Sequence, residues 1–96
     1  MEQLRQKIDQ ADQKLLASFV ERMAVVAEIA AYKVAHHLPV TDQHREKRII
    51  AALQEQAGAA LAEDVARLWQ LLFEISCDYQ QKLMQGEPSA SDGAER

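Results

Sequence analysis

The hydrophobic pattern from Leu4 to Lys33 predicts one very long amphipathic helix. Apolar residues recur at helical spacing over about eight turns, and the stretch contains neither proline nor glycine. At about 100° per residue, one arc of the helical wheel holds Leu4, Ile8, Ala11, Leu15, Phe19, Val26 and Ile29. We therefore predict a first helix from Glu2 to Ala35. A chain of this size cannot cover such a helix alone, so we expect a partner chain.

Two shorter amphipathic segments follow, separated by residues that end or begin helices. Pro39 ends the first helix, and Thr41 or Asp42 can cap the second. Gly58 can stop the second helix. We predict the two helices from Asp42 to Gln56 and from Ala62 to Met84. Their apolar faces comprise Ile49, Ile50, Leu53, Leu61, Val65, Leu68, Leu72, Ile75, Tyr79 and Leu83. The predicted fold class is all-α, with three helices and a very long first helix.

The composition changes after Met84. Residues 85–96 are rich in Gly, Pro, Ser, Asp and Glu and carry no apolar periodicity. We expect a helical domain over residues 1–84, followed by a disordered C-terminal tail over residues 85–96.

Composition and charge narrow the class of protein. The formal net charge of −4 argues against a nucleic-acid partner and against an anionic membrane surface. No apolar run has the length of a membrane span, and the start does not resemble a signal peptide. The single cysteine, Cys77, excludes an intrachain disulfide and fits a reducing compartment. We therefore expect a cytoplasmic protein.

Two cations interrupt the apolar arc of the first helix. Arg22 and Lys33 fall inside it, and Arg5 lies at its edge, where it would suit a neighbouring subunit. Because an unpaired buried cation is costly, each needs an anion. That anion is either an acidic side chain from another helix or a bound ligand.

A ligand at these cations would be a small molecule with two anionic groups. Arg22 and Lys33 are separated by roughly 16 Å of helix rise, which two long side chains can bridge. Arg5 and Arg45 could add further clamps. No nucleophile, metal set or poised histidine accompanies them, so binding and electrostatic catalysis are favoured over covalent or acid–base catalysis.

Other polar residues have ordinary explanations that spacing alone leaves open. Asp42, Arg45 and Glu46 could form a surface charge cluster at a helix start. In the third helix, Ser76 could bond its own backbone and Gln80 could lie at the surface. The three histidines match no common zinc spacing, so we expect them in solvated positions and expect no metal or cofactor.

The segments LRQKIDQADQKLL, ERM, EIAAYK, LPVTDQHRE and ISCDYQQ, in this order, resemble the all-helical chorismate mutase family. The similarity extends from Leu4 to about Met84, and it is to the short, monofunctional, cytoplasmic type, since no further enzyme domain fits in the chain. The resemblance implies an intertwined homodimer in which the long first helices pack together. It also implies conversion of chorismate to prephenate, on the way to phenylalanine and tyrosine.

The resemblance assigns roles to the residues around the ether bond that breaks in the reaction. Arg22 would bind the enolpyruvyl carboxylate, with Arg5 reaching it from the other subunit. Lys33 would donate to the ether oxygen, and Gln80 would be the second donor. The predicted catalytic residues are therefore Lys33, Gln80 and Arg22.

The resemblance also assigns groups around the ring of the substrate. Arg45 and Ser76 match positions that serve the ring carboxylate, and Asp42 and Glu46 match positions near the ring hydroxyl. The reaction is an intramolecular rearrangement without a covalent intermediate. It therefore needs an oriented conformer and stabilised charge on the ether oxygen, which these residue types can supply.

Two other interpretations remain open. Relatives with the same fold act as isochorismate pyruvate lyases or aminodeoxychorismate mutases, although Glu46 beside Arg45 favours the substrate with a hydroxyl group. The chain could instead be a non-catalytic helical dimerisation module whose cations pair with acids across helices.

Overall fold

A computed structural model describes residues 1–86 as three α-helices and one short 3₁₀ turn. The elements are α1 (Glu2–His36), α2 (Gln43–Ala57), η1 (Ala59–Leu61) and α3 (Ala62–Met84). No strand occurs among these residues, which confirms the all-α prediction. The predicted ends of all three helices lie within one residue of the observed ends. Most of the predicted tail, residues 87–96, lies outside the described part of the chain.

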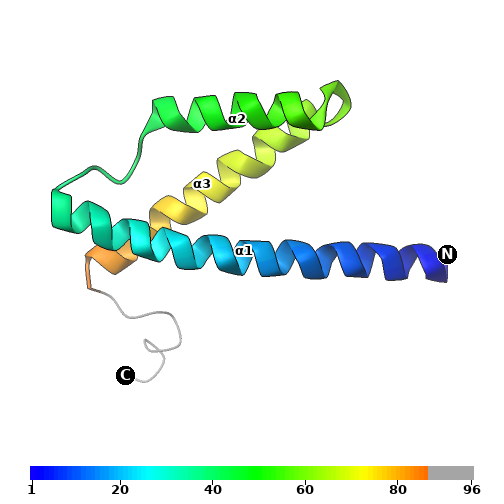
Figure 1. Cartoon of the computed structure of the whole chain (residues 1–96), viewed down its shortest axis with the longest axis horizontal. Coiled ribbons are helices and arrows are strands. Elements are labelled where there is room, and N and C mark those ends of the chain that lie inside the picture. Colours follow the sequence, from blue (N-terminus) through cyan, green and yellow to red (C-terminus); the bar gives the residue numbers. More distant parts are fainter. Residues whose placement is uncertain (87–96) are drawn as a thin grey trace, which may run out of the picture.

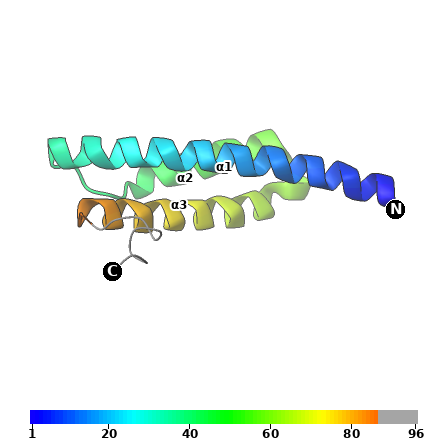
Figure 2. The ribbon, with the colours of Figure 1, turned by 90° about the horizontal axis from the view of Figure 1, so that it is seen from below.

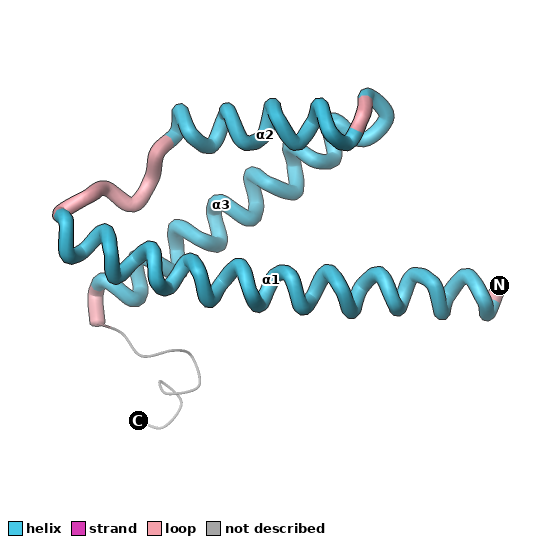
Figure 3. Tube along the Cα trace, in the orientation of Figure 1, coloured by secondary structure: helices cyan, strands magenta, loops and turns pink. Residues whose placement is uncertain are grey.

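Helix α3 holds the other two helices together. In Figure 1 it runs diagonally from the end of α2 to the second half of α1. It packs against both of them, whereas α1 and α2 make no backbone contact with each other in the described chain. Figure 2 shows the same arrangement from below, and Figure 3 marks the connections as loops. The space between α1 and α2 is therefore bordered by α3.

The first half of α1 projects beyond the other helices. Every residue from 2 to 18 is exposed, including the apolar side chains of Leu4 (59%) and Ile8 (58%). The buried apolar side chains of the described chain are Val26 and Ala30, in the second half of α1. Of the apolar arc predicted from the sequence, the single chain buries Val26 and partly covers Phe19, while Ile29 is 40% exposed.

The faces of α2 and α3 are only partly covered. Most of their predicted apolar positions are half-buried, but Leu61 and Leu68 are exposed. The buried positions of α3 are instead polar, Ser76 and Gln80. No helix within residues 1–86 has the length and hydropathy needed to cross a membrane.

The connection between α1 and α2 is fixed at both ends. His37 takes a left-handed conformation with φ 56°, and its N–H donates to Val34 O at 3.3 Å. The Leu38 N–H donates to Lys33 O at 2.9 Å, which completes a helix-ending turn. At the far end, Asp42 Oδ1 accepts from the backbone N–H of Arg45 at 3.1 Å. Of the two predicted caps, Asp42 is therefore the one in place.

The connection between α2 and α3 depends on Gly58. Its φ of 92° and ψ of 164° lie in a region that is essentially restricted to glycine. The Gly58 N–H donates to Gln54 O at 3.0 Å, and Gln54 Nε2 donates across the turn to Ala62 O at 2.9 Å. The predicted stop at Gly58 is confirmed.

Substitutions at the two positive-φ residues of these connections should have opposite effects on stability. Gly58→Ala should destabilise the fold by about 1–3 kcal/mol, because alanine must adopt a strained conformation. His37→Gly should be neutral or slightly stabilising, because glycine adopts φ 56° without strain. Urea unfolding at one fixed protein concentration measures both. Equal stability of Gly58→Ala and the wild type would show that this turn relaxes freely.

Candidate functional site

A cavity of about 790 Å³ lies between the second half of α1, residues 38–42, the start of α2 and the end of α3. Its volume is in the range of small-molecule sites. Seven of the eight predicted site positions line it: Arg22, Lys33, Asp42, Arg45, Glu46, Ser76 and Gln80. Residues far apart in the sequence thus meet at one place in the fold.

The α1 wall explains why cations occur in an apolar arc. Arg22, Val26, Ile29 and Lys33 are spaced by four, three and four residues, so they share one face of the helix. The two apolar side chains lie between the two charged ones. This face therefore offers an apolar surface with a cation at each end.

Arg22 is half-buried and has no acidic partner among residues 1–86. Its Nη1 donates to Ser76 Oγ at 2.5 Å, and its guanidinium carbon lies 5.9 Å from the centroid of the Phe73 ring. The ion pair of the described chain joins Arg67 to Asp64 at the exposed start of α3. Burial lowers the pKa of Arg22, but a guanidinium still remains charged at neutral pH. The positive charge of Arg22 is therefore not neutralised by the described residues.

The polar pair on α3 is buried rather than exposed. Ser76 and Gln80 are each 6% exposed, so the surface interpretation of Gln80 is wrong. Ser76 Oγ does donate to its own helix, to Leu72 O at 2.7 Å, and it also accepts from Arg22. Gln80 Oε1 is buried without a hydrogen-bond partner in the described chain. A buried amide with an unused polar atom is costly unless a ligand or water satisfies it.

Lys33 occupies the other end of the α1 wall. Its side chain is half-buried, and Nζ donates to the backbone carbonyl of Val40 at 2.5 Å. No carboxylate within residues 1–86 lies within ion-pair distance of Nζ. The ammonium is thus held in place by a neutral acceptor.

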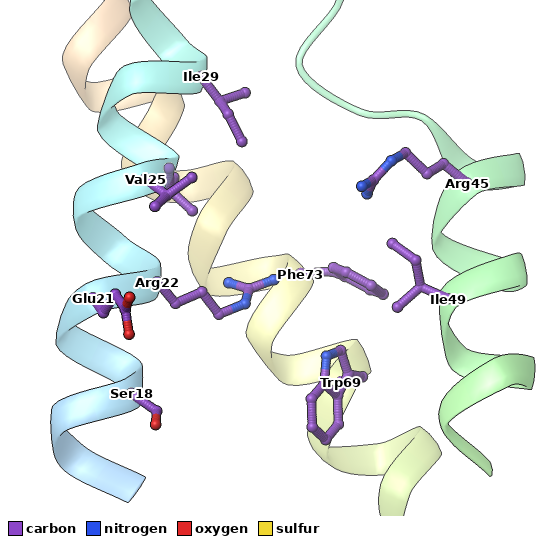
Figure 4. A pocket seen from close by; sticks show the side chains of 10 residues that line it. Ser18, Glu21, Arg22, Val25, Ile29, Arg45, Ile49, Trp69 and Phe73 are labelled. Atoms are coloured by element: carbon purple, nitrogen blue, oxygen red, sulfur yellow. The ribbon is translucent and has the colours of Figure 1, made fainter. Parts of the chain in front are cut away.

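Helix α2 supplies the opposite wall. Arg45 is exposed, and Glu46 is half-buried one position further along. An adjoining hollow has a volume of about 460 Å³. Figure 4 shows that Arg22 and Arg45 extend into the space between α1 and α2, with Phe73 beside them. Three cations and two carboxylates line the main cavity, so its charge favours an anionic ligand.

Arg5 is the predicted site residue that the single chain does not bring to the cavity. It lies on the projecting, exposed part of α1, roughly 25 Å of helix rise from Arg22. A contribution from Arg5 to the cavity of its own chain is therefore excluded by the geometry of α1. Its predicted role in a neighbouring subunit is compatible with this position.

Ser76, which the resemblance groups with Arg45 at the ring carboxylate, accepts from Arg22 in the structure, and both Ser76 and Arg45 line the cavity. The histidines lie outside the cavity lining. His36 stacks on Tyr32 with ring centroids 4.0 Å apart. No group of His, Cys, Asp and Glu within residues 1–86 could hold a metal ion.

Sequence reasoning missed several lining residues. Phe73 and Cys77 line the cavity from α3, and their positions three residues before Ser76 and Gln80 could have indicated this. The sequence could not indicate that the Val40 carbonyl accepts from Lys33, because every residue carries a backbone carbonyl.

Comparisons with known proteins found a matching family and related sequences. A family model described as "Chorismate mutase type II" matches residues 4–81. The bifunctional chorismate mutase/prephenate dehydratases of Enterobacter agglomerans and Escherichia coli (strain K12) are each 38% identical over 84 residues. The alignment covers 85% of this chain but only 22% of each relative, so the chain matches about a fifth of their length. No solved structure matches the chain.

The unneutralised charge predicts that Arg22 does not stabilise the fold. Arg22→Met keeps the apolar stem and removes the charge, so its melting temperature should equal or exceed that of the wild type. Arg67→Met, at the exposed Asp64 pair, is the control and should change little. Thermal unfolding measures both. A drop of more than about 5 °C in Arg22→Met, roughly 1 kcal/mol, would show that the Arg22–Ser76 hydrogen bond stabilises the fold.

Proposed function

Since the chain belongs to the chorismate mutase type II family, we propose that it rearranges chorismate to prephenate in the cavity between α1, α2 and α3. The observation that carries this proposal is the convergence of seven predicted site residues on one cavity. Within residues 1–86, none of its cations has a carboxylate within ion-pair distance. A dianionic substrate would supply the missing counter-charges.

The substrate must first be held in the compact conformer in which the new carbon–carbon bond can form. We propose that Arg22 binds the enolpyruvyl carboxylate, because a guanidinium offers two parallel N–H groups to a carboxylate. Arg45 on the opposite wall would bind the ring carboxylate. Two fixed charges on facing helices select one geometry of a flexible dianion, and this orientation supplies part of the rate acceleration.

The second contribution is electrostatic. Negative charge grows on the ether oxygen as its bond to the ring breaks. Lys33 and the Gln80 amide, which both line the cavity, would donate to that oxygen. Donors held in a fixed position before the reaction would stabilise the charge of the transition state more than the ground state. The unpartnered atom of Gln80 is its acceptor oxygen, so the NH2 group of the same buried amide is the one that would donate to the ether oxygen.

Asp42 and Glu46 would lie near the ring hydroxyl. Asp42 Oδ1 is engaged in capping α2, so its second oxygen is the one available to a substrate. The half-buried Glu46 can accept a hydrogen bond from the ring hydroxyl of chorismate. Isochorismate pyruvate lyase activity is the competing function on the same cavity, and salicylate formed from isochorismate would identify it.

The assembly that we propose is an intertwined homodimer in which the long first helices pack together. The exposed apolar half of α1 needs cover, and a second copy of the same helix offers a matching stripe. In that arrangement Arg5 of the partner subunit would enter the cavity near Arg22. We also propose a cytoplasmic location, with which the free thiol of Cys77 is compatible.

Turnover of chorismate by the wild type and by a Lys33 variant tests the proposed reaction. Wild-type protein should consume chorismate and release prephenate, whereas Lys33→Ala should lose at least about 100-fold in kcat with its helicity retained. Loss of chorismate absorbance, with products separated by chromatography, measures turnover, and circular dichroism measures folding. Lys82→Ala, on the exposed end of α3, is the control and should keep full activity. Intact chorismate with the wild type would overturn the proposal.

A mixture of two inactive variants tests whether Arg5 of one subunit and Lys33 of the other form one site. Arg5→Ala and Lys33→Ala should each be inactive, but a refolded equal mixture should recover about a quarter of wild-type activity. Half of the dimers would then be mixed, and each would hold one site with both side chains intact. No recovery, although mixed dimers form, would show that Arg5 does not act across the interface.

A further inference from the structure

We propose that residues 37–42, called the strap below, position Lys33 for catalysis through the carbonyl of Val40. This inference rests on the proposed function of Lys33 and extends the site to a backbone group. Val40 and Pro39 are then positioning residues: they act on the substrate through the lysine. Leu38, Pro39, Val40 and Thr41 all line the cavity, so the strap forms one of its walls.

Lys33 is attached to the strap at two points. Its carbonyl oxygen accepts from the Leu38 N–H at 2.9 Å, within the turn that ends α1. Its Nζ donates to Val40 O at 2.5 Å, so the side chain is held two residues further along the same segment. A lysine side chain otherwise has about 2 kcal/mol of rotamer freedom to lose when it binds a ligand. The tether removes part of that freedom before the substrate arrives.

The chemical nature of the acceptor is important. A carboxylate beside Nζ would hold the ammonium equally well, but it would cancel the charge that the substrate needs. A carbonyl has no net charge, so it accepts one hydrogen bond and leaves the positive charge intact. An ammonium has three donors, and two of them remain for the substrate. The Val40 carbonyl therefore orients Lys33 without weakening it.

The strap itself is held in shape by three local features. His37 adopts the left-handed conformation that turns the chain away from α1. The ring of Pro39 restricts φ, and it also restricts the conformation of Leu38. Asp42 caps α2 and fixes the far end. The Val40 carbonyl is thus aimed at Lys33 by a segment with little freedom.

The first test does not depend on activity. Side-chain ammonium protons of lysine give separate ¹H–¹⁵N signals only when they exchange slowly with water. The ligand-free wild type should show such a signal for Lys33, assigned by its loss in Lys33→Ala. Pro39→Gly should lose it, because the freed strap no longer aims the carbonyl. Ala60→Gly, in the other connection and away from the cavity, should keep it. A wild-type Lys33 signal that exchanges as fast as exposed lysines would overturn the proposal.

The second test concerns turnover of chorismate by the same variants. Pro39→Gly should lower kcat roughly tenfold with a smaller change in KM, the equivalent of one hydrogen bond. Ala60→Gly should match the wild type. Full kcat in Pro39→Gly after loss of the Lys33 signal would overturn the positioning role. A protected Lys33 signal in a wild type without mutase activity would overturn the proposed function and leave the tether itself supported.

Discussion

The site depends on one constraint: positive charges are half-buried around an apolar surface without acidic partners among the described residues. Arg22 is held by a serine hydroxyl and an aromatic ring, and Lys33 by a backbone carbonyl. These neutral partners fix the two cations while leaving their charge uncompensated. A fold built only for stability would place carboxylates there or remove the charges, because burying an unneutralised cation costs free energy. The cost is tolerable when a dianion binds between them.

Helix α3 makes this arrangement possible. It packs against α1 and α2, which make no backbone contact with each other in the described chain, so it keeps them apart at a fixed separation. The buried side of α3 carries Ser76 and Gln80 instead of two more apolar residues. A polar side at this position weakens the hydrophobic contact of a small chain. The same choice provides an anchor for Arg22 and an amide for the ligand, so the site is built at the expense of the core.

Because the core of the single chain is small, the exposed half of α1 matters for stability. Val26 and Ala30 are the buried apolar side chains of the described chain, too few to stabilise a fold of this length. A second copy packed on the exposed stripe would supply the missing apolar contact. It would also bring Arg5 of the partner subunit to the cavity, so stability and a complete site would both depend on the same association.

The sequence by itself determined the three helices, their ends and the face of α1 that carries Arg22 and Lys33. These features depend on local rules, since the 3.6-residue period, Pro39, Asp42 and Gly58 act within a few residues. The family resemblance added the set of site residues. Only the tertiary structure decided that Gln80 is buried, that Ser76 bonds Arg22, and that the Val40 carbonyl holds Lys33. Those contacts depend on how α3 and the strap cross α1, and helical periodicity carries no information about which residues from distant segments meet.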